Sequence, residues 1–406
     1  MVLGIIAEYN PFHNGHLYHL LKSKEEAKAD SVIAVIGGNF TQRGEPSLID
    51  KWTKAEMALA NGADLVIELP VLYTISSAEN FADGAIKILN SLKIVDSVSF
   101  GSETEDLNKL NIIANTLFKE PRDFKDYLSS YLKGGESFPK ARELALIKYL
   151  NDSTYEEILS ASNNILGIEY LKALKKYASN INPINIPRIE VGHLSKDYSS
   201  EFTNATNIRK LVYSNRMRDV KSYVPPASYT ILSDEIKSGH FVKGLSRYES
   251  IIIYNLRNMS LEQIAELPDV SEGLEHLIKK AANSCNTLSE FMHIVSTKRY
   301  TETRIRRILL YSLLSITKKD MAISKKIVPY IRILGSNEKG KNLISKIISA
   351  NPRLSVITSV KKFEDINMNK NLKIMLEKDI LATNVYTLGF SQDSLSNLDY
   401  TKKMVN

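Results

Sequence analysis

The feature that most constrains the fold is the alternation of short apolar runs and helix-like runs over the first 200 residues. Each apolar run is short and ends at Gly, Pro or a polar cluster, as buried strands do. Strands separated by helices of ordinary length indicate βαβ units and a mostly parallel sheet. We therefore expect an α/β fold with a Rossmann-like, doubly wound parallel sheet. The expected strands are Leu3–Ala7, Ser31–Ile36, Ala63–Leu69, Asp96–Phe100 and Ile181–Ile186.

The alternation stops near Asp219, and helix-like runs follow one another from there. The Pro225-Pro226 pair cannot continue a helix and makes a plausible boundary. We therefore expect an α/β domain over residues 1–220 and a mostly α-helical domain over residues 221–406. Charge divides in the same way: residues 1–200 carry 21 Lys+Arg and 26 Asp+Glu, whereas residues 201–406 carry 32 and 20. A basic second half favours a polyanionic partner.

Cysteine content and hydropathy exclude several classes of protein. Cys285 is the sole cysteine, which excludes an internal disulfide and any site built from several thiolates. No run reaches the roughly 18 apolar residues of a membrane-spanning helix. The first residues lack the basic segment of a signal peptide and indicate a strand instead. We therefore expect a cytoplasmic protein that does not enter a membrane.

The sharpest motif is His13-Asn14-Gly15-His16, directly after the first expected strand. Ligands bind beyond the carboxyl ends of parallel strands, where a helix start directs N–H groups at phosphate. Gly15 lets the backbone approach a ligand, and His13 and His16 are spaced to face the same one. Both are predicted to be catalytic, since two imidazoles there can stabilise charge on an α-phosphoryl group and departing pyrophosphate. Two surface histidines that cap a helix are the ordinary alternative. Zinc, with His19 as a third ligand, is another, although no His-Glu-x-x-His pattern is present.

A second phosphate segment is expected late in such a domain, and Asn204–Lys210 fits it. A hydroxyl, the N–H groups of the helix start and two cations of this segment would hold the β- and γ-phosphates, and Thr206 and Arg209 are the residues that we assign to the ATP site. An ordinary capped helix start is the alternative. The sequence has neither a P-loop nor a Gly-x-Gly-x-x-Gly after its first strand, which disfavours P-loop enzymes and dinucleotide dehydrogenases.

A first strand followed by His-x-Gly-His, with a later Thr-Asn-Ile-Arg segment, resembles the nucleotidyltransferases related to class I aminoacyl-tRNA synthetases. More closely, the chain resembles the bacterial tRNA(Met) cytidine acetate ligases. The segments that carry this resemblance are GIIAEYNPFHNGH, GNFTQRGEPSLIDKWTKAEMAL, GADLVIELP, SAENFADGAI, FGSE, NNILGIEYLKAL and TKRYTETRIRRILL, within residues 1–310. The resemblance implies an enzyme that activates acetate with ATP as acetyl-adenylate. It then transfers the acetyl group to N4 of the wobble cytidine of elongator tRNA(Met).

The resemblance also implies an ATP site. Gly101 would leave room for the nucleotide, Asn163 or Asn164 would bond the ribose or base, and Arg188 would reach a phosphate or carboxylate. Without the resemblance, Gly101 would be interpreted as a tight turn, Asn163-Asn164 as a helix cap and Arg188 as a surface arginine. Asn204 departs from the Ser common in relatives. Mg²⁺ is expected with ATP, but no metal ligand is predicted. The implied ATP-binding residues are Ala7, Glu8, Tyr9, Asn10, Pro11, Phe12, His13, Asn14, Gly15, His16, Leu17, Tyr18, His19, Leu20, Gly101, Asn163, Asn164, Arg188, Thr206 and Arg209.

The polar, Gly-rich loop Gly37–Pro46 follows the second strand and would face the same crevice. We predict that Arg43 and Lys51 pair with the acetate carboxylate or the acyl-phosphate; a surface loop without such a role is the alternative.

A cluster of cations near residue 300 is predicted to bind tRNA, because cations interleaved with a tyrosine suit RNA phosphates and an unstacked base. A solvated helix face is the alternative. The cluster comprises Lys298, Arg299, Tyr300, Arg304, Arg306 and Arg307.

The function that we predict is therefore an ATP-dependent tRNA cytidine acetate ligase. Two alternatives remain open. A small-molecule adenylyltransferase of the nicotinamide mononucleotide or phosphopantetheine type would share the first domain but would need no basic helical half. A non-catalytic tRNA-binding protein would keep the nucleotide site as a relic. No stable protein partner is evident from the sequence.

Overall fold

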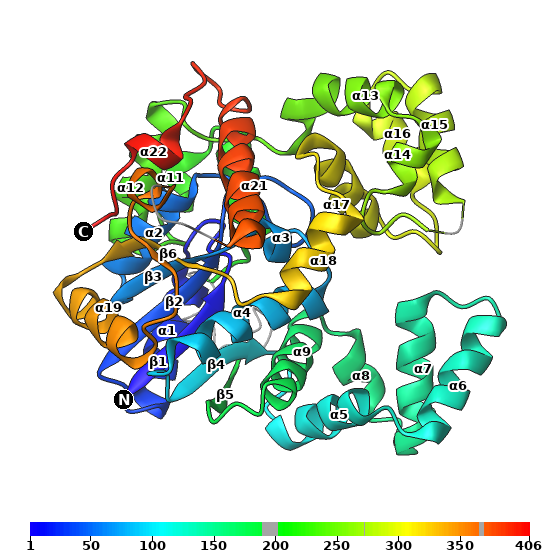
Figure 1. The fold of residues 1–406 in the computed structure, drawn as a ribbon, viewed down its shortest axis with the longest axis horizontal. Coiled ribbons are helices and arrows are strands. Elements are labelled where there is room, and N and C mark those ends of the chain that lie inside the picture. The colour runs from blue at the N-terminus through cyan, green and yellow to red at the C-terminus, as the bar shows by residue number, and fades with distance from the viewer. Residues whose placement is uncertain (189–201, 272, 365–368) are drawn as a thin grey trace.

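A seven-stranded sheet forms the centre of the computed structural model, which describes residues 1–188, 202–271, 273–364 and 369–406 (Figure 1). The strands lie in the order β5-β4-β1-β2-β3-β6-β7. All pairs are parallel except β3 with β6, which is antiparallel. The strands are β1 (Val2–Ala7), β2 (Ser31–Gly37), β3 (Leu65–Leu69), β4 (Ser97–Ser102), β5 (Asn182–Pro187), β6 (Ile331–Ser336) and β7 (Val356–Ile357).

The sheet has its topological switch point beside β1. The chain runs from β1 to β2 and β3 on one side, then returns to place β4 and β5 on the other. The loops that leave β1 and β4 therefore diverge at the carboxyl edge and leave room for a ligand. The predicted doubly wound, mostly parallel sheet is confirmed, and all five predicted strands are present within a few residues of their expected bounds.

Alternate residues of the central strands pack against helices on opposite faces of the sheet. Leu3 and Ile5 of β1 pack with Leu20 of α1 (Asn14–Glu26), and Ala34 and Ile36 of β2 belong to the apolar cluster of α2 (Lys51–Ala60). The intervening positions, such as Ile33 and Val35, belong to the large cluster that includes α4 (Ala78–Leu92) and α9 (Ser162–Lys176). Burial on both faces explains why these strands are continuous apolar runs.

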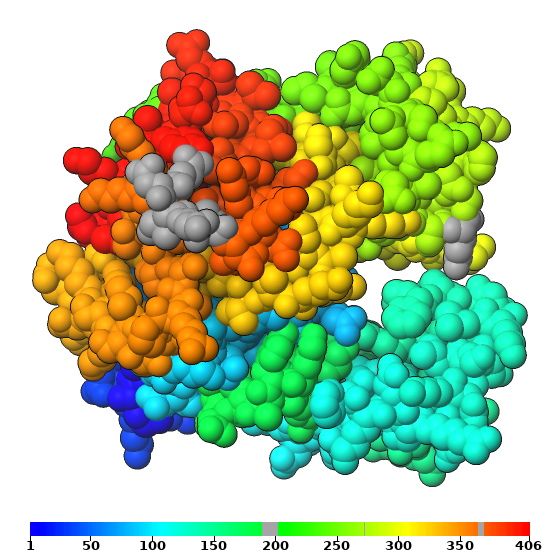
Figure 2. Space-filling model, in the orientation of Figure 1, coloured from blue at the N-terminus to red at the C-terminus, as the bar shows by residue number. Residues whose placement is uncertain are grey.

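Two helical lobes extend from the sheet on the right of Figure 1, and Figure 2 shows an open gap between them at the surface. The first lobe follows β4 and comprises α5 (Leu107–Lys119), α6 (Arg122–Lys133), α7 (Phe138–Leu150) and α8 (Tyr155–Ser160). The second comprises η1 (Leu245–Tyr248), α13 (Glu249–Asn258), α14 (Leu261–Ala265), α15 (Leu274–Ser284), α16 (Leu288–Val295) and α17 (Glu302–Leu313).

The second half of the chain is mainly helical, but it also contributes β6 and β7 to the sheet of the first half, which the sequence analysis did not predict. The boundary at residue 220 between an α/β domain and a helical domain stays a prediction. No helix in the described ranges is long and apolar enough to cross a lipid bilayer. The remaining helices are α3 (Val71–Thr74), α10 (Ala205–Tyr213), α11 (Met217–Val220), α12 (Pro226–Lys237), α18 (Lys318–Lys326), α19 (Glu338–Ala350), α20 (Val360–Glu364), α21 (Lys370–Thr387) and α22 (Leu398–Thr401).

Candidate active site at the carboxyl end of β1

The two predicted catalytic histidines lie against each other at the start of α1. The His13 and His16 rings are stacked, with centroids 3.7 Å apart and planes 25° apart. The backbone N–H of His13 donates to His16 Nδ1 at 3.2 Å. Gly15 makes this arrangement possible, because a Cβ there would come within 2.9 Å of His13 Cε1. The glycine of the motif thus leaves the space that the His13 ring occupies.

Burial keeps both imidazoles neutral. Desolvation, with the charges of Arg188 and Arg209, lowers the pKa of His13 from 6.5 to about 3. Desolvation, with His13 and Arg188 next, holds the pKa of His16 well below its ordinary value. Since His16 Nδ1 accepts a hydrogen bond, a neutral His16 carries its proton on Nε2 and can donate from there. His13 is only 5 % exposed, which does not fit the alternative of two surface histidines.

His13 Nδ1 is buried and has no hydrogen-bond partner within the described residues. Buried polar atoms are nearly always satisfied, so an unsatisfied one at a helix start calls for an explanation. A phosphate oxygen or a ligand hydroxyl would satisfy it. The site therefore has unused hydrogen-bonding capacity where a nucleotide is expected.

Aromatic side chains of the same loop pack against His16. Tyr9 lies edge-on to His16 at 5.0 Å, and Phe12 lies 5.6 Å from it. Tyr9, Phe12 and Leu20 are almost fully buried, so they support the loop from the protein side. The remaining predicted residues of the loop are the apolar Ala7, Pro11 and Leu17, and Tyr18, whose hydroxyl has no hydrogen bond with the described residues.

Polar side chains tie the same loop to its neighbours. Glu8 Oε1 accepts from the Gln42 N–H at 2.7 Å, and Asn10 Oδ1 accepts from the Leu48 N–H at 2.7 Å. Asn14 Nδ2 donates to the carbonyl of Ser222 at 3.0 Å.

The predicted second phosphate segment meets this loop. Arg209 Nη1 donates to the Asn10 carbonyl at 2.8 Å, and Nη2 donates to Thr206 Oγ1 at 3.1 Å. The Asn204 side chain accepts from the Asn207 N–H at 2.9 Å and caps α10. Two segments almost 200 residues apart in sequence therefore form one surface.

The loops after β4 and β5 complete the other side of the switch point. A Cβ on Gly101 would lie 3.4 Å from Arg188 Cγ and 3.7 Å from His19 Cδ2. Arg188 Nη1 donates to Asn163 Oδ1 at 3.1 Å. His19, whose pKa burial lowers to about 4, lies 3.2 Å from Ser99 Oγ. These predicted residues are therefore neighbours in space.

Asn164 has a structural position. It is 2 % exposed, and its Oδ1 accepts from the N–H groups of Glu103 and Thr104. Glu103, which the sequence analysis did not single out, in turn accepts from the N–H groups of Asn163 and Asn164 at the start of α9. Its place in the FGSE segment was the available signal.

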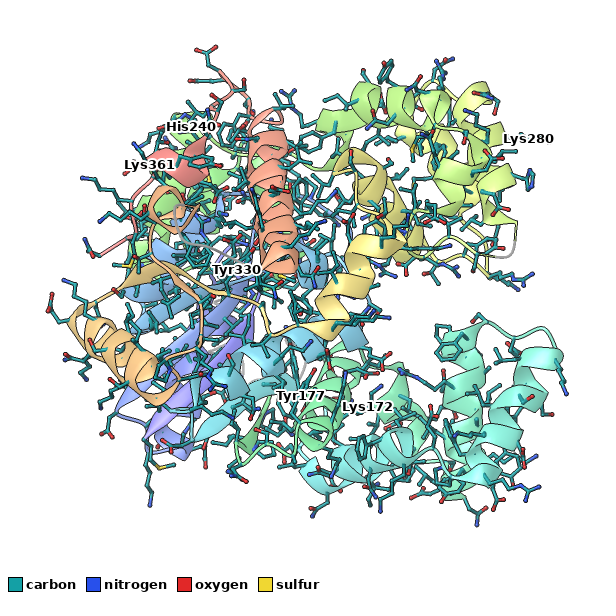
Figure 3. The ribbon with its side chains drawn as sticks, in the orientation of Figure 1. Lys172, Tyr177, His240, Lys280, Tyr330 and Lys361 are labelled. Atoms are coloured by element: carbon teal, nitrogen blue, oxygen red, sulfur yellow. The ribbon has the colours of Figure 1, made fainter. Side chains whose placement is uncertain are left out.

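The prediction that Lys51 pairs with acetate is contradicted. Lys51 is fully buried, and its Nζ donates to both oxygens of Glu68 at 2.9 Å and to Asp399 at 2.8 Å. Arg332 joins the same two carboxylates from β6. Tyr330, labelled in Figure 3 beside α21, donates to a further buried carboxylate, Asp379. These charges compensate one another inside the protein.

Arg43 is exposed and has no hydrogen bond with the described residues. Its contact with acetate stays a prediction. The sequence analysis also missed Lys54, which is buried and donates to the carbonyls of Gly37 and Gly38 at 2.7 and 2.5 Å. Lys54 thus holds the start of the loop that carries Arg43.

The cluster near residue 300 is largely engaged in the fold, which contradicts much of its predicted role in binding tRNA. Tyr300 and Arg307 are buried, and Arg307 pairs with Asp269 at 2.9 Å. Arg304 donates to the Asp269 carbonyl, and Arg306 pairs with Glu45 and Glu302. Lys298 and Arg299 are exposed and remain candidates.

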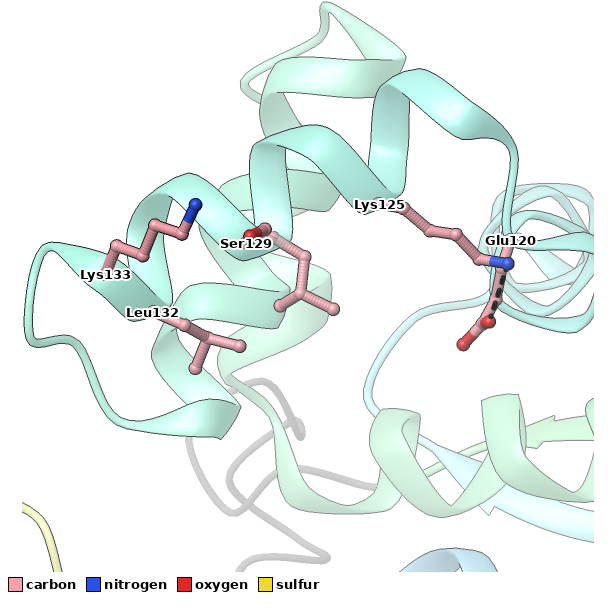
Figure 4. Close-up of a pocket in the computed structure, with 6 residues that line it drawn as sticks. Glu120, Lys125, Ser129, Leu132 and Lys133 are labelled. Carbon is pink, nitrogen blue, oxygen red and sulfur yellow. Dashed lines mark ion pairs between the residues drawn. The ribbon is translucent and has the colours of Figure 1, made fainter.

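Two surface hollows, one along α6 and one of about 490 Å³ along α13, are lined by none of the predicted site residues. A hollow of about 400 Å³ lies along α6, where Lys125 pairs with Glu120, and none of the predicted residues lines it (Figure 4). The described ranges hold no group of three or more His, Cys, Asp or Glu side chains that could bind a metal ion.

Known proteins resemble this chain over its whole length. The family model described as HIGH Nucleotidyl Transferase matches residues 1–400. A relative from Thermoanaerobacter sp. (strain X514), named tRNA(Met) cytidine acetate ligase, is 48% identical over 100% of this chain and 99% of its own. A relative of the same name from Caldanaerobacter subterraneus subsp. tengcongensis is 47% identical over 98% of both chains.

A solved structure agrees with these relatives. Thermotoga maritima TmcAL bound with alpha-thio ATP is 35% identical, has a TM-score of 0.93, and is matched over 100% of this chain and 99% of that one. The chain therefore belongs to the HIGH nucleotidyl transferase family, among the relatives named tRNA(Met) cytidine acetate ligase.

Proposed function

We propose that this protein is an ATP-dependent ligase that forms acetyl-adenylate from acetate and acetylates N4 of the wobble cytidine of elongator tRNA(Met). One observation carries the proposal most directly: a stacked, neutral His13–His16 pair at the switch point with an unsatisfied buried nitrogen. The names of the relatives and the nucleotide bound by the Thermotoga maritima structure support the choice of substrates.

In the first step an acetate oxygen attacks the α-phosphorus of ATP, and the bond to pyrophosphate breaks. His13 and His16 donate hydrogen bonds to the phosphate oxygens on which charge increases. Arg209 and Thr206 lie on the side where the departing pyrophosphate is expected, next to Asn10. Removing one such preorganised donor typically costs about 10²–10³-fold in rate. Arg43 is the cation that we propose for the acetate carboxylate.

In the second step the cytidine N4 amine attacks the acetyl carbonyl, AMP leaves, and the amine loses a proton. An exocyclic amine is a weak nucleophile, so activation of the acid as an adenylate is chemically necessary. The product is N4-acetylcytidine. Residues 1–220 would carry out the activation, and residues 221–406 would contribute mainly to holding tRNA.

We expect Mg²⁺ to accompany the triphosphate, because oxygen-rich phosphates are its usual partners in nucleotide enzymes. No group of three or more His, Cys, Asp or Glu side chains capable of holding a metal is found in the described part of the chain. The ion would thus arrive with ATP as part of the substrate. Together with the absence of a spanning helix in the described ranges, the choice of substrates favours a cytoplasmic location.

Mass analysis of tRNA nucleosides after incubation with ATP, acetate and the purified protein tests the proposal. N4-acetylcytidine that depends on both ATP and acetate is expected. Exchange of labelled pyrophosphate into ATP that requires nicotinamide mononucleotide or phosphopantetheine would favour a small-molecule adenylyltransferase instead. Binding of tRNA without ATP consumption, unaffected by His16→Ala, would favour a non-catalytic protein.

A further inference from the structure

The positive charge of the second half is unevenly distributed. Residues 249–300, which form most of the second helical lobe, carry five Lys+Arg and seven Asp+Glu. Residues 203–248, which precede that lobe, carry eight Lys+Arg and three Asp+Glu. Their helix α10 supplies Thr206 and Arg209 to the candidate active site. The basic surface of this region is therefore next to the nucleotide site.

Several cations of the lobe are also occupied by the protein itself. Arg257 donates to the carbonyls of Ala282 and Cys285, each at 2.8 Å. Lys279 donates to the carbonyls of Arg257 and Met259. These side chains close the carboxyl ends of helices, so a nucleic acid would have to compete for them.

Three exposed lysines, Lys210, Lys221 and Lys243, lie in segments that contact the site; we call them the basic rim. None has a hydrogen bond or an ion pair with the described residues. Lys210 is four residues after Thr206 on α10, so the two share a helix face. Lys221 adjoins Ser222, whose carbonyl accepts from the Asn14 side chain at the start of α1.

Lys243 adjoins the site through Tyr213 of α10, whose hydroxyl donates to the carbonyl of Val242 at 3.4 Å. The backbone N–H of Val242 donates to the carbonyl of Leu48, which follows the loop after β2. Lys243 therefore lies where α10 and that loop meet, between the nucleotide site and the second lobe.

An acid close to this surface, Glu45, is paired within the fold. Glu45 pairs with Arg306 of α17 and accepts from the Leu245 N–H at 3.2 Å. Gly44 lets the two segments approach, since a Cβ there would lie 2.6 Å from Arg306 Cβ. Arg306 therefore removes a negative charge that would repel RNA, a role that differs from the predicted direct contact.

We propose that the basic rim holds the RNA phosphates on either side of the base that is acetylated, an inference that rests on the proposed function. The reacting cytidine must enter the site as an unstacked base, as RNA loops allow. Its flanking phosphates then necessarily lie close to the mouth of the nucleotide site. Three lysine ammonium groups without an ion pair among the described residues supply the charge that an RNA backbone attracts, and Lys243 contacts the face of the Phe241 ring, at 5.7 Å.

A triple variant, Lys210→Glu, Lys221→Glu and Lys243→Glu, tests the inference against a control of equal charge. The control is Lys133→Glu, Lys280→Glu and Lys346→Glu, which changes exposed lysines of α6, α15 and α19; Figure 3 shows Lys280 at the outer edge of its lobe. The measurements are the Kd for a tRNA(Met) transcript at several salt concentrations and acetate-dependent exchange of pyrophosphate into ATP.

The rim variant should bind tRNA at least tenfold more weakly than the control, and its salt dependence should fall by about one unit of slope per lysine. The double variant Lys221→Glu, Lys243→Glu, which leaves the phosphate segment Asn204–Lys210 unchanged, and the control should both retain exchange, which shows that they are folded. Equal tRNA affinity of the rim and control variants would overturn the inference. If the wild type binds tRNA through the rim but supports no acetate-dependent exchange, the proposed function fails and the rim remains. If it acetylates tRNA but the rim and control variants bind tRNA equally, the rim alone fails.

Discussion

Burial affects two clusters of ionisable side chains in this protein differently. His13 and His16 lie at the mouth of the switch point with no carboxylate partner among the described residues, and burial suppresses their charged forms. Lys51 lies under the loop after β2 with Glu68 and Asp399, and it remains charged. Burial alone would lower the pKa of Lys51, but the two carboxylates raise it.

The difference distinguishes a ligand-binding site, the histidine pair, from a structural network, the charges around Lys51. A buried charge without a partner is costly, so a protein either neutralises it or pairs it. The paired network joins α2 and β3 to β6 and α22, and it stabilises a particular packing of the chain. The histidine pair keeps donors available for a ligand that brings its own charge.

The largest effect is expected for Lys51→Met, which leaves Glu68 and Asp399 without this partner. Removing one partner of a buried pair typically costs about 3–5 kcal/mol of stability. Denaturant unfolding would measure the loss, and Lys346→Met on the surface of α19 is the control, with a change within about 0.5 kcal/mol. An unchanged stability with abolished acetate-dependent exchange would instead restore Lys51 to the substrate site.

Gly15→Ala should lower activity without lowering stability, whereas Lys51→Met should lower stability. The added Cβ would meet the His13 ring at 2.9 Å and displace it. A displacement of this kind can cost about 10²-fold in rate. Alanine favours helix more than glycine by up to about 1 kcal/mol, so stability should not fall. Initial rates and thermal unfolding would be compared with Gly134→Ala at the exposed end of α6. Full activity of Gly15→Ala would show that the stacked geometry is dispensable.

A smaller effect is expected from pH. The pKa of His13 is about 3 in the folded protein and 6.5 as its ordinary value, so the unfolded chain binds more protons between these limits. Stability should therefore be complete above about pH 6.5 and fall as pH decreases, by on the order of 1–2 kcal/mol at pH 5 from this residue. His13→Asn should reduce the pH dependence of unfolding and leave the part that His16 and His19 contribute. An equally steep curve for the variant would place the titration elsewhere.

The sequence predicted the sheet well because the central strands β1, β2 and β3 are buried on both faces and form apolar runs with clear ends. It also located the histidine motif, since a loop and its following helix are local. It did not predict β6, because the short segment Ile331–Ser336 is interrupted by Arg332 and is ambiguous by periodicity alone.

The wrong site predictions share one cause, which is a distant partner. Lys51 was assigned to the site from its nearness to a polar loop, but its partner Asp399 is 348 residues away. Arg306 was assigned to RNA from its spacing on a helix, but its partner Glu45 is 261 residues away. Composition and spacing reveal a cation, whereas only the fold reveals whether that cation is already paired.

The most direct test of the account is acetate-dependent exchange of labelled pyrophosphate into ATP by the wild type, His13→Ala and His16→Ala. The account predicts exchange by the wild type and a loss of about 10²–10³-fold in each variant, with the variants still folded. Exchange by folded variants at the wild-type rate would contradict the claim that this histidine pair stabilises the reacting triphosphate.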